Sequence, residues 1–165
     1  MVKKLCLIFL FIAIICGISI VSNAAETPIL DTTPYPNSEP RNDFFANGTP
    51  ITITEKVGGG VTITWTGGSM DVVSGTRIFG GGNEGKSYTT SNIVMNSGTV
   101  SHIYGGGRGS VSQTSNVDTA NITINGGTIS KSIYGGGALS SRVKNTKIVV
   151  NAGQIANING RRISF

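Results

Sequence analysis

The clearest formal motif for chemistry in this sequence is Gly80–Ser87, which reads GGGNEGKS and satisfies the phosphate-loop pattern G-x-x-x-x-G-K-S. In a nucleotide site the glycines let backbone N–H groups approach a phosphate, and the helix that follows directs its N-terminus at the anion. Here the following residues, Tyr88–Asn96, are of strand and turn type, and the glycine triplet recurs without a lysine at Gly105–Gly107 and Gly135–Gly137. We therefore attribute the match to glycine-rich composition, and a nucleotide is not expected as a partner.

The acidic residues offer a poor basis for catalysis. Glycoside hydrolysis requires a pair of carboxylates, and lyase chemistry requires carboxylates for a metal or a basic residue beside an acidic sugar. From Ile51 onwards the acidic residues are few and fall in different segments: Glu55, Asp71, Glu84 and Asp118. We expect a protein that is not an enzyme. Asp71 and Glu84 could still approach each other in space, which keeps a carbohydrate-active enzyme as an alternative.

Metal and cofactor sites are not expected either. His102 is the only histidine and has no acidic neighbour in sequence, so we interpret it as a surface or turn residue. Cys6 and Cys16 both lie in the N-terminal segment, which leaves the rest of the chain without a thiolate ligand or a disulfide. The residues after the glycine triplets also lack the regular aspartate of calcium-binding nonapeptide repeats.

Three aromatic residues are the first candidates for ligand binding. Phe79, Tyr104 and Tyr134 each follow an isoleucine that is expected to point into the core, so their own side chains should point outwards. A stripe of aromatic rings, one repeat apart, could stack on sugar rings. The alternative is structural: the rings stack on one another and seal the sheet against water.

Basic residues are the second candidates. From His102 onwards seven basic residues accompany Asp118 alone, and the four proposed for binding are Arg108, Lys131, Arg142 and Lys144. A field of this sign favours anionic polymers outside the cell, such as wall teichoic acids or acidic polysaccharides of the cell wall or a host. Nucleic acid is not expected as a partner of an exported chain. The alternative is that these are solvated loop charges that keep a glycine-rich protein soluble.

An internal repeat must position these candidates. Asn121–Gly137, NITINGGTISKSIYGGG, can be laid over Asn92–Gly107, and weaker copies occupy Thr62–Gly82 and Lys147–Gly160. Short runs with apolar residues at every second position indicate strands, and no window has the spacing of an amphipathic helix. The isoleucines before the triplets are 25, 30 and 25 residues apart. The sequence therefore predicts an all-β fold, a short parallel β-helix (β-solenoid) of about four rungs of 25–30 residues.

Rungs about 4.8 Å apart would place equivalent side chains above one another. The expected inward rows are Ile63, Ile93, Ile122 and Ile148; Trp65, Met95, Ile124 and Val150; Met70, Val100, Ile129 and Ile155; and Ile78, Ile103, Ile133 and Ile158. A ladder of side-chain amides is expected at Asn96, Asn125 and Asn151. Corner glycines of positive φ are expected at Gly68, Gly98, Gly127 and Gly153.

The chain divides into three parts. Residues 1–24 combine a basic start, an uncharged apolar run and small residues before Ala25, which predicts a signal peptide; an uncleaved membrane anchor is the alternative. Residues 25–50 contain all five prolines and are expected to form a linker, in which Phe44-Phe45 could cap the following domain. Residues 51–165 form the repeat domain. Its irregular last copy leaves an open end, which invites end-to-end stacking with another copy.

The repeats resemble those of bacterial adhesin-like surface proteins, whose glycine-rich β-solenoids carry strings of GGT[IV]…IYGGG. The residues that carry the likeness are Gly98–Val100 with Ile103–Gly107, and Gly127–Ile129 with Ile133–Gly137. The resemblance covers roughly residues 61–160 and implies a secreted or cell-surface role in adhesion or matrix structure. The alternatives are a self-assembling extracellular fibre subunit and a carbohydrate-binding or carbohydrate-active β-helix protein.

Overall fold

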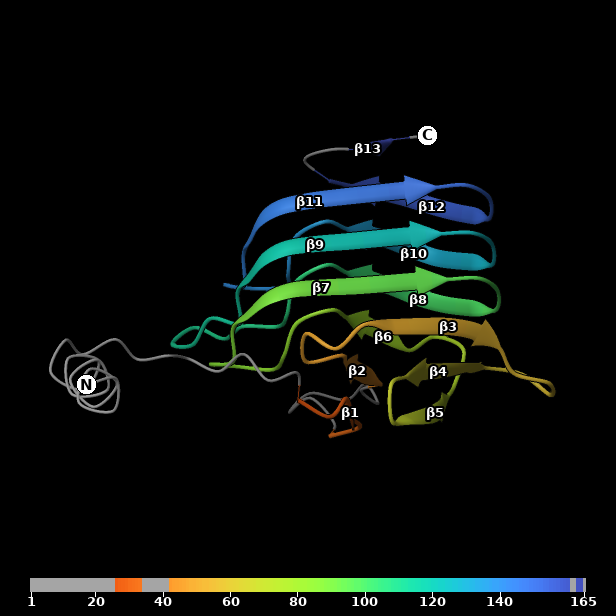
Figure 1. Cartoon of the computed structure of the whole chain (residues 1–165), viewed down its shortest axis with the longest axis horizontal. Helices are drawn as coiled ribbons and strands as arrows, with labels where there is room; N and C mark the ends of the chain where they lie inside the picture. The colour runs from red at the N-terminus through yellow and green to blue at the C-terminus, as the bar shows by residue number, and fades with distance from the viewer. Residues whose placement is uncertain (1–25, 34–41, 161–162, 165) are drawn as a thin grey trace, which may run out of the picture.

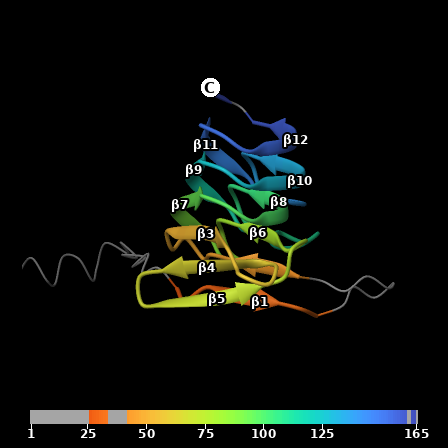
Figure 2. The ribbon, with the colours of Figure 1, turned by 90° about the vertical axis from the view of Figure 1, so that its right-hand side faces the viewer.

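The computed structural model describes residues 26–33, 42–160 and 163–164, which form an all-β protein of two mixed sheets (Figure 1). The six-stranded sheet contains, in spatial order, β1 (Ile29–Asp31), β2 (Asp43–Phe45), β6 (Arg77–Phe79), β8 (Thr99–Tyr104), β10 (Thr128–Tyr134) and β12 (Gln154–Asn159). The seven-stranded sheet contains β13 (Ile163–Ser164), β11 (Val143–Val150), β9 (Val117–Ile124), β7 (Tyr88–Met95), β3 (Ile51–Glu55), β4 (Val61–Trp65) and β5 (Gly68–Val72). Figure 2 shows the sheets side by side, with β1 and β5 at one end of the stacked strands and the C-terminus at the other.

From Tyr88 onwards each new strand crosses to the opposite sheet. β7, β9 and β11 pair in parallel in one sheet, and β8, β10 and β12 pair in parallel in the other. The register confirms the expected row of Ile78, Ile103, Ile133 and Ile158, and it also confirms the last three residues of each of the other rows. Side chains alternate between the two faces of a strand, so this register brings like residues together on the inner face.

The prediction is wrong for the first residue of the other three rows. Ile63 does not lie below Ile93, because β4 pairs antiparallel with both β3 and β5. In these pairings Ile63 lies between Ile53 and Met70, and Trp65 lies opposite Gly68. The segment is an antiparallel meander at the end of the seven-stranded sheet.

β3 takes the place that the repeat assigned to β4. Ile51 pairs with Ile93, and Ile53 pairs with Met95. The chain then reverses through three glycines of positive φ, Gly58–Gly60, so that β4 runs back beside β3. An alternating apolar pattern serves a parallel strand and an antiparallel one equally well, so the pattern of Val61–Trp65 could not distinguish them.

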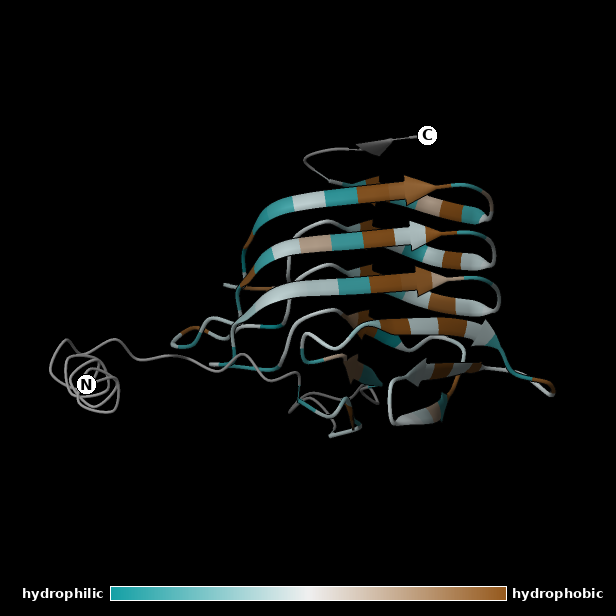
Figure 3. Cartoon of the chain, in the orientation of Figure 1, coloured by the Kyte–Doolittle hydropathy of each residue, from teal (hydrophilic) through white to brown (hydrophobic). Residues whose placement is uncertain are grey.

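The hydrophobic core lies between the two sheets. Apolar positions recur in register along β7, β9 and β11 (Figure 3). The inward side chains of the middle strands are 0–1% exposed, among them Ile78, Ile93, Met95, Ile103, Ile122, Ile124, Ile129 and Ile133. Packing of stacked β-branched residues between two paired sheets is the main source of stability in such an arrangement.

The turn that follows β7, β9 and β11 carries the expected amide ladder. Asn125 Nδ2 donates to Asn96 Oδ1 at 2.9 Å, and Asn151 Nδ2 donates to Asn125 Oδ1 at 2.7 Å. Positive φ is confirmed at three of the expected corner glycines, Gly98, Gly127 and Gly153. The prediction is wrong for the fourth, Gly68, because Gly67 is the residue of positive φ in the β4–β5 turn.

Part of the proline-rich segment belongs to the folded body. β2 pairs in parallel with β6, which places Phe44 beside Ile78 and Phe45 beside Phe79. Both phenylalanines are fully buried, so this part of the segment packs on the repeat strands, as the capping alternative for Phe44-Phe45 expects. The expected signal segment, residues 1–24, lies outside the described residues. Within the part of the chain that the structure describes, no helix is long and apolar enough to cross a membrane.

Candidate functional site

Four aromatic rings stack on the outer face of the six-stranded sheet, and we call them the aromatic ladder: Phe45, Phe79, Tyr104 and Tyr134. Each ring follows an inward residue of its strand, and the parallel register places it over its neighbour. Ring centroids are 4.9, 4.6 and 4.8 Å apart along the ladder, and the last two pairs are within 8° of parallel. The ladder therefore matches the strand spacing of the sheet.

The stacking decides which part of each ring a ligand can reach. Phe79 and Tyr104 have a ring against both faces, so a sugar cannot stack on them. Phe45 and Phe79 are fully buried, whereas Tyr104 and Tyr134 are half-buried. The ladder ends at Tyr134 because Asn159 occupies the equivalent position on β12. Ligand contact is thus restricted to the edges of the two tyrosines and the end of the ladder.

A hollow of about 390 Å³ lies along these tyrosines, and we call it the ladder hollow. Its lining consists of Arg77, Phe79, Tyr104, Arg108, Tyr134, Gly137, Ala138 and Leu139. Leu139 is 75% exposed and has a φ of 56°, a left-handed conformation that is unfavourable for a leucine by about 1–2 kcal/mol. The loop after β10 thus holds an apolar side chain at the rim of the hollow.

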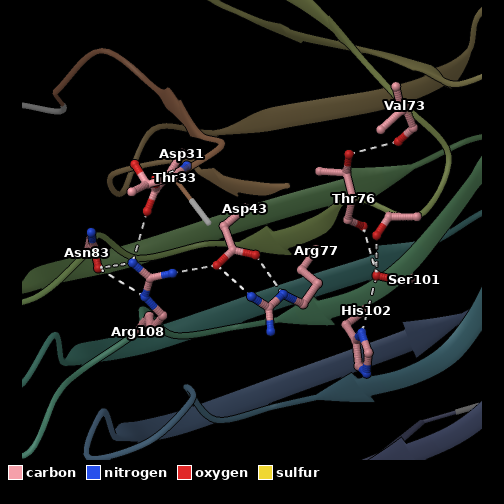
Figure 4. A network of polar contacts seen from close by, with 11 residues as sticks. Asp31, Thr33, Asp43, Val73, Thr76, Arg77, Asn83, Ser101, His102 and Arg108 are labelled. Atoms are coloured by element: carbon pink, nitrogen blue, oxygen red, sulfur yellow. Dashed lines mark hydrogen bonds and ion pairs between the residues drawn. The ribbon is translucent and has the colours of Figure 1, made fainter. Parts of the chain in front are cut away.

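Arg108 anchors the base of the hollow within a network of polar contacts (Figure 4). Its Nη1 lies 2.5 Å from Asp43 Oδ2, its Nη2 lies 3.1 Å from Asp31 Oδ2, and both Nε and Nη2 donate to Asn83 Oδ1. The guanidinium also lies 5.1 Å from the ring centroid of Phe45. Arg108 is only 3% exposed, so its side chain is committed to these contacts and serves the hollow as a fixed, buried charge.

Asp43 is the centre of this network. It is fully buried and accepts from Arg77 at two points, from Nε at 2.6 Å and from Nη2 at 2.8 Å, in addition to the contact with Arg108. Bidentate pairing of a guanidinium with a carboxylate fixes both side chains in one plane. The network holds β1, β2, β6 and the loop after β8 together beneath the ladder hollow.

His102 flanks the ladder on its other side. Its ring lies 5.8 Å from Tyr104 and 6.2 Å from Tyr134, centroid to centroid, and its Nδ1 is 3.2 Å from Ser101 Oγ. Burial lowers the pKa of His102, and the positive charges of Arg77 and Lys131 lower it further, although Asp43 acts in the opposite direction. The residue belongs to β8, so its interpretation as a turn residue is wrong.

The predicted binding residues do not all meet. The ladder hollow joins Phe79, Tyr104, Tyr134 and Arg108. Lys131 belongs to β10 but does not line the hollow. Lys144 lies at the start of β11 in the other sheet, where its Nζ is 2.6 Å from Asp118 Oδ1, and Arg142 directly precedes that strand.

Four residues of the site were not singled out from the sequence as binding residues: Asp43, Phe45, Arg77 and Leu139. Arg77 precedes an inward isoleucine and Phe45 follows an inward phenylalanine, so strand alternation could have placed both on the outer face. Asp43 could be found only by recognising Asp43–Phe45 as a strand, which the surrounding prolines obscure. Nothing in the sequence pattern marks Leu139.

The phosphate-loop motif has the wrong surroundings for a nucleotide. The N–H groups of Gly80 and Gly81 donate to the carbonyls of Tyr104 and Gly106 in the next strand and turn. The N–H of Gly85 donates to the carbonyl of Thr114. The motif runs into strand β7 where a phosphate loop runs into a helix. These backbone N–H groups therefore form hydrogen bonds within the fold, to the neighbouring strand, turn and loop.

Asp71, one of the acidic residues considered for catalysis, is occupied by two polar partners. Asp71 accepts from Thr62 Oγ1 at 2.7 Å and lies 3.0 Å from Lys56 Nζ. The hydrogen bond from Thr62, together with Lys56, lowers the pKa of Asp71, which holds it ionised and unsuited to act as an acid. Among the described residues no group of three or more His, Cys, Asp and Glu side chains is placed to hold a metal ion.

Similarity to known proteins does not add to this geometry. Comparisons with protein-family models, with curated proteins and with solved structures found no match for this chain. What the site does must follow from its own residues.

Proposed function

We propose that the chain is a secreted or cell-surface, adhesin-like β-solenoid that binds an anionic glycan at the ladder hollow and has no catalytic activity. The parallel registers of β7 to β12 and the shared rows of apolar residues support the solenoid. The apolar N-terminal segment supports export. The resemblance of the glycine-rich repeats to adhesin-like surface proteins supports the class.

The observation that carries the proposal is the ladder hollow itself. It combines the edges of two half-buried tyrosines, the exposed Leu139 and two guanidinium groups, those of Arg77 and Arg108, which are held in place by Asp43. Carbohydrates bind where aromatic or apolar surface lies beside oriented polar groups, and carboxylated sugars need a compensating positive charge. Lys131, an exposed residue of β10, the strand that also contains Tyr134, supplies a positive charge outside the lining of the hollow. An enzyme has no equivalent support, because Asp43 and Asp71 are both paired with basic side chains.

Calorimetric titration with an oligogalacturonate, a carboxylated glycan, tests the proposal, with neutral dextran as the control ligand. We expect binding of the oligogalacturonate alone. Lys131→Ala should weaken it about tenfold, the effect of losing roughly 1.4 kcal/mol from a charge-assisted contact. Lys144→Ala is the matched control, because this exposed lysine pairs with Asp118 on the other sheet. Equal loss in both variants, or no binding by the wild type, would refute the site.

A further inference from the structure

The two ends of the stacked strands are built differently, and the described residues leave the end at β12 partly uncovered. Val150, Ile155 and Ile158 of the last two long strands pack on the core but remain partly exposed. Their equivalents one strand earlier, Ile124, Ile129 and Ile133, are 0–1% exposed. β12 is also the terminal strand of the six-stranded sheet, so one side of its backbone faces outwards.

The middle glycines of the three triplets, Gly81, Gly106 and Gly136, show the same difference between the two ends. A Cβ on Gly81 would lie 2.6 Å from the backbone N of Gly107, and a Cβ on Gly106 would lie 2.9 Å from Gly137. The equivalent position on Gly136 meets nothing within 4 Å. A hollow of about 310 Å³ lies beside it, lined by Gly136, Val143, Thr146, Asn159 and Gly160. The described residues thus leave room for one more layer of chain at this corner.

The N-terminal end offers edges and exposed apolar side chains. β1 is the terminal strand of the six-stranded sheet, and β5 is the terminal strand of the other (Figure 1). Ile29 in β1 is 46% exposed, and Val73, which follows β5, is 59% exposed. The core rows themselves are closed here, because Phe44 and Ile63 are fully buried.

The strands at the two ends carry opposite charges. At one end, β1 contains Asp31 and β5 contains Asp71. At the other end, β11 contains Lys144 and Lys147, and neither β11 nor β12 contains an acidic residue. A contact between unlike ends therefore brings opposite net charges together, whereas a contact between like ends does not.

From this charge complementarity and the two open edges we infer that the protein assembles head to tail with further copies of itself, β12 of one copy docking on β1 of the next. β2 and β12 run in the same direction as the strands between them, and β1 runs antiparallel to β2. Translation along the stack therefore sets β12 antiparallel to the next β1, a regular pairing. This contact joins two different surfaces, so it grows into open filaments and does not close as a dimer.

Sedimentation and light scattering of the full chain, purified as the producing cell releases it and studied without glycan, test the inference. We expect the mean mass to rise with concentration beyond that of a dimer and to fall with added salt. Ile29→Lys should raise the concentration needed for half-assembly about tenfold or more, because it places a lysine against the basic end of the neighbour.

Val111→Lys is the matched control, because Val111 is fully exposed in the loop between β8 and β9, away from both ends. It should assemble as the wild type does. Circular dichroism on each variant confirms that the sheet content is unchanged. A wild type that stays monomeric, a mass that stops at the dimer, or equal assembly of Ile29→Lys and the wild type would overturn the inference. None of these outcomes depends on whether the ladder hollow binds a glycan.

Discussion

Arg108 Nη1 lies 2.5 Å from Asp43 Oδ2, although the two residues are 65 positions apart in the sequence. Arg108 is 3% exposed and Asp43 is fully buried, so both charges have left water. Each is matched by more than one partner: Asp43 also accepts two hydrogen bonds from Arg77, and Arg108 also contacts Asp31 and Asn83. The pair joins β2, which contains Asp43, to the loop after β8, which contains Arg108, and it fixes the base of the ladder hollow.

Replacement of Arg108 tests this network. Arg108→Met keeps most of the side-chain volume but leaves the buried carboxylate of Asp43 with Arg77 alone. Breaking a buried ion pair from one side typically destabilises a protein by about 3–5 kcal/mol, and the remaining pair should hold the loss near the lower value. The free energy of unfolding in urea, compared between the variant and the wild type, measures this loss. Arg142→Met is the control, since Arg142 is exposed and its loss should change the free energy of unfolding by less than about 0.5 kcal/mol.

The aromatic ladder predicts unequal effects for its two tyrosines. Tyr104 stacks on Phe79 and on Tyr134, whereas Tyr134 stacks on one ladder ring only. Each stacked pair contributes about 0.5–1.5 kcal/mol beyond the burial of its area. Tyr104→Ala should therefore destabilise the fold about twice as much as Tyr134→Ala in thermal or urea unfolding. Equal losses would mean that the rings act as separate side chains.

The sequence was sufficient to predict strands and register wherever its pattern repeats. Ile103 and Ile133, with their glycine triplets, align without ambiguity because the same residue types recur at the same spacing. The first strands could not be placed in this way. The alternation of Ile51–Thr54 and that of Val61–Trp65 are alike, and only the glycines between them allow the reversal that makes the second strand antiparallel. Local pattern sets which face is apolar, but the direction of pairing depends on the turn.

The candidate site was predictable in part for the same reason. The ladder positions repeat, so Tyr104 and Tyr134 could be placed on the outer face from the sequence alone. The network around Asp43 does not repeat, and it joins segments that are distant in sequence. Such contacts have no periodic signal. Arg108 accordingly appeared as a surface charge in the sequence, and only the fold shows that it is buried.

His102 predicts a pH dependence of stability. Its pKa in the folded chain is below the ordinary 6.5, first because of burial and then because of Arg77 and Lys131. The folded state therefore favours the neutral ring, so the stability from this residue is complete above pH 6.5 and is lost as pH falls through the lower folded pKa. His102 is the only histidine, and its ring resonance in an NMR titration should report a midpoint below 6.5.

A variant separates this effect from other acid-sensitive groups. His102→Gln should remove the part of the decline that begins near pH 6.5 and leave the decline at lower pH, where Asp71 is protonated. The free energy of urea unfolding at about pH 7.5 and about pH 5.5 measures the first part for each protein. A midpoint above 6.5, or the same pH dependence in the variant, would contradict the assigned environment of the ring.

The glycine triplets predict that alanine has opposite effects on stability at two equivalent positions. Gly106 and Gly136 each occupy the middle of a triplet, and neither has a left-handed φ, so an alanine is strained only by its neighbours. A Cβ on Gly106 would lie 2.9 Å from the Cα and N of Gly137, which are backbone atoms and cannot move without shifting the next strand. Gly106→Ala should therefore cost about 1–3 kcal/mol in urea unfolding, the usual price of overpacking.

Gly136→Ala is the matched variant, and its expected effect has the other sign. Nothing lies within 4 Å of the added Cβ, so the folded chain accepts it, and the loss of a flexible glycine from the unfolded chain should stabilise the protein by about 0.4–1 kcal/mol. The pair also reports on assembly, since a copy docked over this corner would meet the new methyl group. Gly136→Ala should then weaken head-to-tail association while leaving the monomer as stable as the wild type or more so. If both substitutions destabilised the monomer equally, the last corner would be covered in the folded chain.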